Sequence, residues 1–433
     1  MRKLTVVVYL MVCLTVIAFT EGQPEAEETG VQEISFWHTL TGLQGDFLDQ
    51  TVALFNESQS DIFAVSTRVP TTNVADVSKL MASIAAGVGP DVFFVDRNTV
   101  SQRAYEGVIQ DLEPYLNEIG WEDPESEYLS FVWPEVLWQD KVYALPFEAD
   151  MRVMFYRADH FEAAGLDPDD PPKTLEELDQ IAETLTATDA EGRLKRVGFV
   201  PWYGQASVYT WGPVYGASWF DFETKQLTAN SPKMVDAVTR YAEYMDKYPG
   251  IVRFASGFGR GETDPFVSGL LSIIFNTDKY IAFINEYGPS VDYRVAPMPR
   301  PAELADEPVA WSGGFALSIP AGAKSPGAAM EFIRFMTGPE GQKYFCERNT
   351  SFPTNKIAFE TTSLRDNPEH QVFFDLLPHT QIRPAIPIWG KLWPAQHAVR
   401  DDVINGIKTP KEALDEMVAL IQPDIDYIFS LYE

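Results

Sequence analysis

The side chains that could perform catalysis form no recognisable catalytic motif in this sequence. The five histidines (38, 160, 370, 379 and 397) include no His-x-x-x-His pair and no cysteine partner at metal-binding spacing. A Gly-x-Ser-x-Gly nucleophile elbow and a phosphate-binding Walker loop are both absent. A glycosidase needs two carboxylates about 5–10 Å apart, a separation that sequence spacing does not determine. We therefore predict no catalytic residue, metal or cofactor, and keep a secreted carbohydrate-active enzyme as the alternative.

Binding a polyhydroxylated solute needs a different set of side chains, and this sequence is rich in them. Flat aromatic rings cover the apolar C–H face of a pyranose, while carboxylate, amide and guanidinium groups hydrogen-bond to its hydroxyls. Leaving a buried polar partner unpaired costs about 1–3 kcal/mol, so such sites discriminate between sugars. Aromatic residues make up 13% of the chain. The candidates in loops and at strand ends are Trp37, His38, Trp202, Tyr203, Trp211, Trp311, Arg383 and Trp389, and each could equally pack in a core or pair with a neighbour.

The elements that would position these candidates alternate between strand and helix patterns. Apolar runs at 33–37, 62–69 and 91–95 predict strands, and helical spacing of apolar residues at 47–55 and 77–84 predicts the helices between them. This order predicts a parallel sheet with right-handed crossovers. Ligands of such sheets bind beyond the carboxyl ends of the strands, where Trp37, His38 and Asp96 lie.

Two further helices carry clear start signals. Thr174 is followed three residues later by Glu177, and Thr409 by Glu412, which predicts a capping box at each helix start. Pro410 occupies the first helical position of the second.

Length and charge give the general class of the protein. A chain of 433 residues is too long for one ordinary core, which predicts two lobes. Its formal charge of −30 repels nucleic acid and anionic membrane surfaces. We expect no nucleic-acid partner and a monomer.

The N-terminus has the layout of a secretory signal peptide. Arg2 and Lys3 precede an apolar run that is short for a membrane span, and residues 1–22 are predicted to be removed. A retained anchor, or lipid attachment at Cys13, is the alternative. The acidic segment 23–30 predicts a solvated tether. After cleavage only Cys346 remains, so no internal disulfide is expected.

The stretch "LPFEADMRVMFYRADHFEAAGL", residues 145–166, resembles an interlobe crossover of the extracellular solute-binding proteins of family 1, the sugar receptors of ABC importers. The family pattern is a Tyr-Gly/Ala-x-Pro segment, an apolar strand and a helix ending in Ala-Gly-Leu. Further resemblances are "PKTLEEL", "PFVSGLLSIIF", "GGFALSIPAGAKSPGAAMEFIRFMTGPEGQ", "FPTNK" and "GIKTPKEAL", in the family's order. The resemblance covers roughly residues 34–421.

The resemblance implies an α/β fold of the periplasmic-binding-protein type, with two α/β lobes joined by three hinge crossovers. We expect the crossovers near 147–149, 295–297 and 320–323. The N-terminal lobe would comprise 31–147 and 296–320, and the C-terminal lobe 148–295 and 321–433. Glu148 and Asp150 would then lie at the floor of the cleft.

The implied function is an exported, periplasmic or extracellular receptor that captures a sugar or oligosaccharide and delivers it to a membrane permease. Asn276 and Asp278, in "FNTDKY", join the candidate ligand-binding residues, although relatives often have Gly-x-Trp there. A phosphate ester, a polyamine or a peptide remains open as the ligand.

Overall fold

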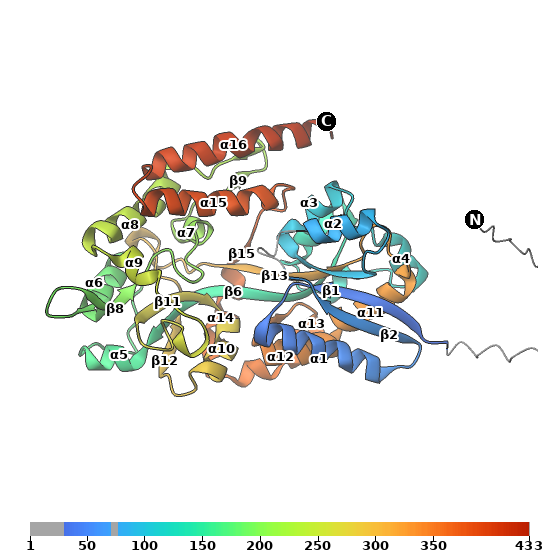
Figure 1. Ribbon diagram of the computed structural model, residues 1–433, viewed down its shortest axis with the longest axis horizontal. Coiled ribbons are helices and arrows are strands. Elements are labelled where there is room, and N and C mark those ends of the chain that lie inside the picture. The colour runs from blue at the N-terminus through green and yellow to red at the C-terminus, as the bar shows by residue number, and fades with distance from the viewer. Residues whose placement is uncertain (1–29, 71–76, 433) are drawn as a thin grey trace, which may run out of the picture.

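The structure is a computed structural model that describes residues 30–70 and 77–432 (Figure 1). The predicted signal peptide, and all of the predicted tether except Gly30, lie outside these residues. Within the described ranges, no helix is long and apolar enough to cross a membrane.

The N-terminal strands and helices form the predicted parallel sheet. Strands β1 (Gln32–His38), β2 (Ile62–Arg68) and β3 (Val92–Asp96) lie in the order β2-β1-β3, with both pairings parallel. Helices α1 (Gly42–Ser58) and α2 (Ser78–Ala85) connect them. The strand and helix predictions for residues 33–95 are thus confirmed. This half also contains α3 (Val100–Tyr105), α4 (Glu113–Glu118), and the short strands β4 (Leu137–Trp138) and β5 (Lys141–Val142).

A second α/β unit lies at the other end of the same curved sheet (Figure 1). Its strands are β7 (Ala187–Thr188), β8 (Leu194–Phe199), β11 (Leu271–Thr277) and β12 (Tyr293–Ala296), with the small hairpin β9 (Phe220–Asp221) and β10 (Gln226–Leu227). Its helices are α5 (Ala158–Ala163), α6 (Leu175–Leu185), α7 (Val208–Val214), α8 (Pro232–Lys247), α9 (Ile251–Ala255) and α10 (Lys279–Tyr287). We call the two ends of the sheet, with their helices, the first and second lobes.

Two long strands run through both lobes. Strand β6 (Leu145–Arg157) pairs with β13 (Ala310–Ser318) over its first half and with β11 and β12 over its second half. Strand β13 pairs with β15 (Thr380–Ile382) at its start and with β3 at its end. The chain therefore enters the second lobe along β6 and returns along β13. The return lies C-terminal to the predicted crossover at 295–297, because those residues still pair with the second half of β6.

The third passage follows two helices of the first lobe. Helices α11 (Pro326–Thr337) and α12 (Pro339–Asn349) pack on α1, and α11 also packs on α4 and β1. Strand β14 (Phe352–Pro353) then pairs with Glu148 and Ala149 in the first half of β6, and α14 (Pro368–Leu376) packs on β12 of the second lobe. The crossing thus lies after α12, beyond the predicted 320–323.

The remaining helices complete the molecule. They are α13 (Lys356–Thr361), which packs on α12, and α15 (Trp389–Ile404) and α16 (Pro410–Ser430), which pack on each other and on α8. The predicted capping boxes at Thr174–Glu177 and Thr409–Glu412 are both present, at the starts of α6 and α16.

Candidate functional site

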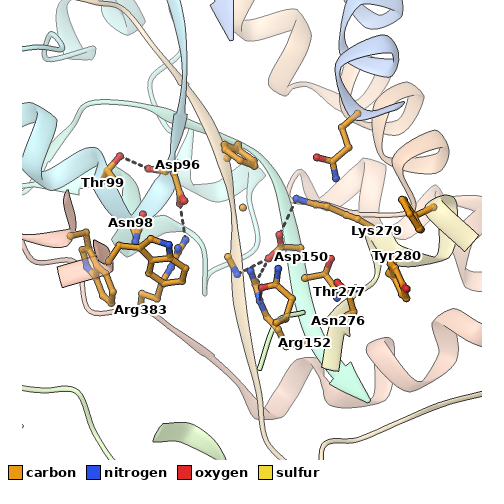
Figure 2. A pocket seen from close by; sticks show the side chains of 18 residues that line it. Asp96, Asn98, Thr99, Asp150, Arg152, Asn276, Thr277, Lys279, Tyr280 and Arg383 are labelled. Carbon is orange, nitrogen blue, oxygen red and sulfur yellow. Dashed lines mark hydrogen bonds and ion pairs between the residues drawn. The ribbon is translucent and has the colours of Figure 1, made fainter. Parts of the chain in front are cut away.

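A polar cavity of about 370 Å³ lies between the two lobes, where β6 and β13 pass from one to the other. Its volume is typical of small-molecule sites, which measure roughly 300–1,000 Å³. The first lobe, the second lobe and the crossing strands all contribute to its wall (Figure 2). The lining residues are Gln44, Asp96, Asn98, Thr99, Asp150, Arg152, Gln205, Asn276, Thr277, Lys279, Tyr280, Phe283, Gly313, Gly314, Phe315, Arg383, Trp389 and Trp393.

One wall of the cavity carries an ion pair between segments far apart in the sequence. Asp96 ends β3, and Arg383 follows β15; the Arg383 Nη2 donates to the Asp96 Oδ1 at 2.8 Å (Figure 2). Behind them the Glu135 carboxylate lies 3.7 Å from Arg383 Nε and accepts from Arg97 Nε at 2.9 Å. Asp96 and Glu135 outweigh the effect of burial and raise the pKa of Arg383, which keeps its charge.

The floor carries a second group of charges, drawn from β6 and α10. Lys279 Nζ lies 2.9 Å from both Glu148 Oε1 and Asp150 Oδ2, and Arg152 pairs with the other oxygen of Asp150. Asp150 also accepts from the Gly313 backbone N–H at 2.9 Å. Side chains alternate in direction along a strand, so Asp150 and Arg152 share the cavity face of β6.

Burial and neighbouring charge act differently on the acids of this floor. Burial by itself would raise the pKa of Asp150, but Arg152 and Lys279 outweigh it and hold that pKa well below its usual range. For Glu148 and Asp278, the effect of burial is larger than the opposing effect of the nearby Lys279. Burial therefore raises the pKa of each carboxyl group. The Asp150 carboxylate is therefore the firmly ionised acid at the floor.

The ring of Trp311 contacts the guanidinium groups of two cavity arginines. The Arg152 guanidinium lies 3.6 Å from the ring centroid of Trp311, and the Arg383 guanidinium lies 5.6 Å from the same ring. Trp311 is fully buried, and its indole N–H donates to Thr210 Oγ1 at 3.1 Å. A buried ring stacked on a guanidinium holds that group in place by a cation–π contact. The two arginines are therefore held in fixed orientations before any ligand binds.

Several candidates predicted from the sequence meet at this cavity. Asp96, Asp150, Asn276, Arg383 and Trp389 line it. Three further candidates lie directly behind the lining. Glu148 contacts Lys279, Asp278 accepts from the Met151 N–H at 3.3 Å, and Trp311 lies under Arg152.

The other candidates do not line the cavity. Trp211 is completely buried and donates to the Pro201 carbonyl at 2.7 Å. Trp202 packs edge-on against Tyr241, and Tyr203 packs against Phe258.

The two candidates on β1 also lie apart from the cavity. His38 is buried with its Nε2 3.1 Å from Asp49 Oδ1. Trp37 is half-buried and packs at the edge of the core.

Sequence reasoning missed the residues that dominate the second-lobe wall. Arg152 and Lys279 supply two of its charges, and Tyr280 and Phe283 supply aromatic rings. Arg152 could have been found from strand periodicity, because it lies two residues after Asp150 on the same strand. The sequence does not mark Tyr280 and Phe283 as cavity residues, because their spacing also suits a helix packed on the core.

Within residues 30–70 and 77–432, no group of three or more His, Cys, Asp or Glu side chains could hold a metal ion. What the cavity offers is paired charges, amides, hydroxyls and rings, which can bind a polar solute.

Comparison with known proteins shows which family this chain resembles in sequence. The profile of the bacterial extracellular solute-binding proteins matches residues 50–372. The sn-glycerol-3-phosphate-binding periplasmic protein UgpB of Escherichia coli strain K12 is 26% identical over 412 residues, covering 90% of this chain and 91% of UgpB. UgpB of Yersinia enterocolitica is also 26% identical, covering 91% and 92%.

Solved structures share the fold over almost their whole length. CpMnBP1 with mannobiose bound superposes with a TM-score of 0.81 at 24% identity, covering 90% of this chain and 99% of that chain. The ABC substrate-binding protein Lmo0181 of Listeria monocytogenes, in complex with cycloalternan, gives 0.77 at 21% identity, covering 91% and 99%. The predicted two-lobed α/β fold is confirmed.

These matches also decide between the two functional classes considered from the sequence. The family consists of substrate-binding receptors rather than enzymes, and its members act outside the cytoplasm. The family profile covers most of the described chain, and the resemblance drawn from the sequence motifs is confirmed. This chain belongs to the bacterial extracellular solute-binding proteins.

Proposed function

We propose that the protein is the receptor of an ABC importer and captures a neutral saccharide in the interlobe cavity. The observation that carries this proposal is the pairing of charges. Among the described residues that line the cavity, the cations Arg152 and Lys279 both contact Asp150, and Arg383 contacts Asp96, each within 4.0 Å. A neutral polyol can hydrogen-bond to these fixed groups without removing a counter-charge.

An anionic solute would meet a less favourable site. A phosphate that binds Arg383 or Lys279 must compete with Asp96 or Asp150, or lie close to them. Like charges a few ångströms apart in a partly buried site repel by several kcal/mol. The large negative charge of the chain adds to this repulsion at longer range.

The rings of the cavity suit the apolar faces of a sugar. Trp389, Trp393, Tyr280, Phe283 and Phe315 line the same space as the charged groups. Rings supply contact with C–H faces, and the charged and amide groups supply hydrogen bonds to hydroxyls. The solved relatives with mannobiose and cycloalternan support a saccharide as the ligand class.

A glycerol phosphate ester is the second candidate ligand. The curated relatives named for sn-glycerol 3-phosphate favour it, as does the presence of three cations in the cavity wall. The two candidates differ in charge, so a direct binding comparison separates them.

The remaining parts of the proposal concern the cell and the two lobes. Residues 1–22 would direct export, and residues 23–30 would form a tether. The tether would end free after cleavage of residues 1–22, with attachment to the membrane as the alternative. The protein would act as a monomer and present its closed form to a membrane permease. We place α11 and α12 in the first lobe, with residues 31–147, because they pack on α1.

A thermal-shift screen tests the proposal. The panel comprises manno-, malto-, cello- and xylo-oligosaccharides of one to four units, sn-glycerol 3-phosphate and inorganic phosphate. Because a ligand at a hundred times its Kd adds about 2.7 kcal/mol, a cognate saccharide should raise the Tm by a few degrees. The saccharide should be recovered intact by chromatography. A shift with glycerol 3-phosphate alone, or cleavage of the saccharide, would contradict the proposal.

A further inference from the structure

A second cavity of about 220 Å³ opens beside the first. The two cavities share Gln44, Lys279 and Phe283 in their linings, so they are adjacent chambers of the same interlobe space. The second cavity has fewer charges in its wall. Among the described residues that line it, Lys279 is the single ionisable amine, beside Tyr287, and rings and small polar groups supply the rest. It is too small for a large solute by itself, but it can hold one end of a longer one.

A row of aromatic rings leads from the first cavity into the second. Tyr280, Phe283 and Tyr287 are spaced three and four residues apart on α10, which places them along one face of the helix. The Tyr280 and Phe283 centroids are 5.3 Å apart with nearly parallel planes, and those of Phe283 and Tyr287 are 4.7 Å apart. Tyr280 and Phe283 line the first cavity, whereas Phe283 and Tyr287 line the second.

The opposite wall of the second cavity belongs to the first lobe. Thr41, Gln44 and Phe47, at the start of α1, face it together with Asn349 at the end of α12. Helix α10 lies in the second lobe and packs on α12 (Figure 1). Both chambers therefore have one wall in each lobe, and a single ligand could occupy both when the lobes close.

This arrangement suits an oligosaccharide better than a single sugar. Aromatic rings pack on the apolar C–H faces of pyranoses, so a row of rings along a helix can contact consecutive sugar units. Hydroxyl and amide groups on the facing wall, from Thr41, Gln44 and Asn349, can hydrogen-bond to the outer edge of such units.

We propose that the second cavity is a chain-extension subsite, in which Phe283 and Tyr287 stack on the units of an oligosaccharide whose first units lie in the charged cavity. This proposal rests on the proposed function and names its ligand as an oligosaccharide. Tyr287 contacts the extension alone, since it lines only the second cavity.

Calorimetric titration with manno-, malto-, cello- and xylo-oligosaccharides of one to four units tests the subsite. In the series that binds, the affinity of the wild type should rise with chain length and then level off. In Tyr287→Ala the shortest binder should keep its affinity, and the longer ones should lose roughly 2- to 12-fold, the value of one aromatic contact. If Tyr287→Ala folds poorly, Phe47→Ala on the facing wall takes its place in the titration. It should give the same selective loss of affinity for the longer oligosaccharides.

Tyr427→Ala is the matched control, because Tyr427 is an exposed tyrosine on α16. It should bind every length as the wild type does. Saccharide binding that does not depend on length, or a Tyr287→Ala variant equal to wild type at every length, would overturn the subsite and leave the proposed function standing. Failure of all four series to bind would overturn both.

Discussion

At the residue scale, the site depends on how Arg383 is held. Its guanidinium contacts Asp96 on one side, lies near Glu135 on another, and faces the rings of Trp311 and Trp389 at 5.6 and 6.0 Å. Only 3% of the residue is exposed, so its charge is almost fully removed from bulk water. A buried charge of this kind is tolerated because its partners are fixed in place.

Asp96→Asn should therefore change the ligand preference of the cavity. The amide keeps the shape of the carboxylate but leaves Arg383 with a weaker partner and adds one net positive charge. We expect saccharide affinity to fall about tenfold, corresponding to about 1.4 kcal/mol, and binding of inorganic phosphate to become detectable. Calorimetric titration with both ligands measures the change.

Asp46→Asn is a suitable control for this variant. Asp46 is an exposed partner of Arg68 on the surface of the first lobe, so its replacement also adds one positive charge to the molecule. It should leave both affinities unchanged. Equal effects of the two variants would indicate that net charge, rather than the Arg383 pair, sets the preference.

The sequence predicted polar cavity residues better than aromatic ones. Asp96 and Asp150 follow from strand ends and from the crossover pattern, because backbone position determines where such residues lie. Trp202 and Trp211 are candidates because of their ring chemistry, which suits a core as well as a ligand. Trp211 is buried beneath the guanidinium of Arg240 at 5.3 Å, a contact formed by side chains distant in the sequence.

At the scale of elements, the approach of β6 to β13 depends on a glycine. Gly314 has a φ of +138°, and a Cβ at this position would lie 2.2 Å from the Glu148 carbonyl oxygen and 2.9 Å from Arg97 Nη1. A side chain here would push apart the two strands that form the cavity floor. The backbone conformation is itself one that other residues rarely adopt.

Gly314→Ala should destabilise the protein by at least about 1–3 kcal/mol, the usual cost of a strained backbone conformation, before the clash with Glu148 is counted. Denaturant unfolding measures the change in the free energy of unfolding. Gly327→Ala is the control, since Gly327 lies near the start of α11 with ordinary φ and open space around it. It should be neutral or slightly stabilising. Similar losses in both variants would contradict the role given to Gly314.

The order of elements could be predicted, whereas the places of the return to the first lobe and of the third passage could not. Residues 33–95 show clean changes between strand and helix periodicity, and the capping residues Thr174 and Thr409 mark helix starts without help from tertiary structure. All residues of β6 are buried, and β13 is buried almost throughout. Strand β13 is mostly apolar and carries no local mark of where it leaves the second lobe. The return and the third passage therefore lie later in the chain than the expected 295–297 and 320–323, whereas the expected 147–149 lies within β6, which passes between the lobes.

At the scale of the whole molecule, ligand binding should favour the closed arrangement of the lobes. The cavity takes wall residues from both lobes, so only closure allows a ligand to contact Asp96 and Lys279 together. We expect solution scattering to show a smaller radius of gyration when a saccharide that raises the Tm is added. The same experiment with a saccharide that causes no shift is the control. An unchanged scattering curve at saturation would contradict lobe closure.

The antiparallel ribbon formed by β6 and β13 limits the directions in which the lobes can move. Sliding one lobe past the other would break the hydrogen bonds between the two strands, from Leu145–Leu317 to Met151–Ser312. Flexing the ribbon requires only small changes in φ and ψ, shared among many residues. Rotation about an axis across the ribbon is thus the easy motion, and a solute must enter and leave by the side opposite the two strands.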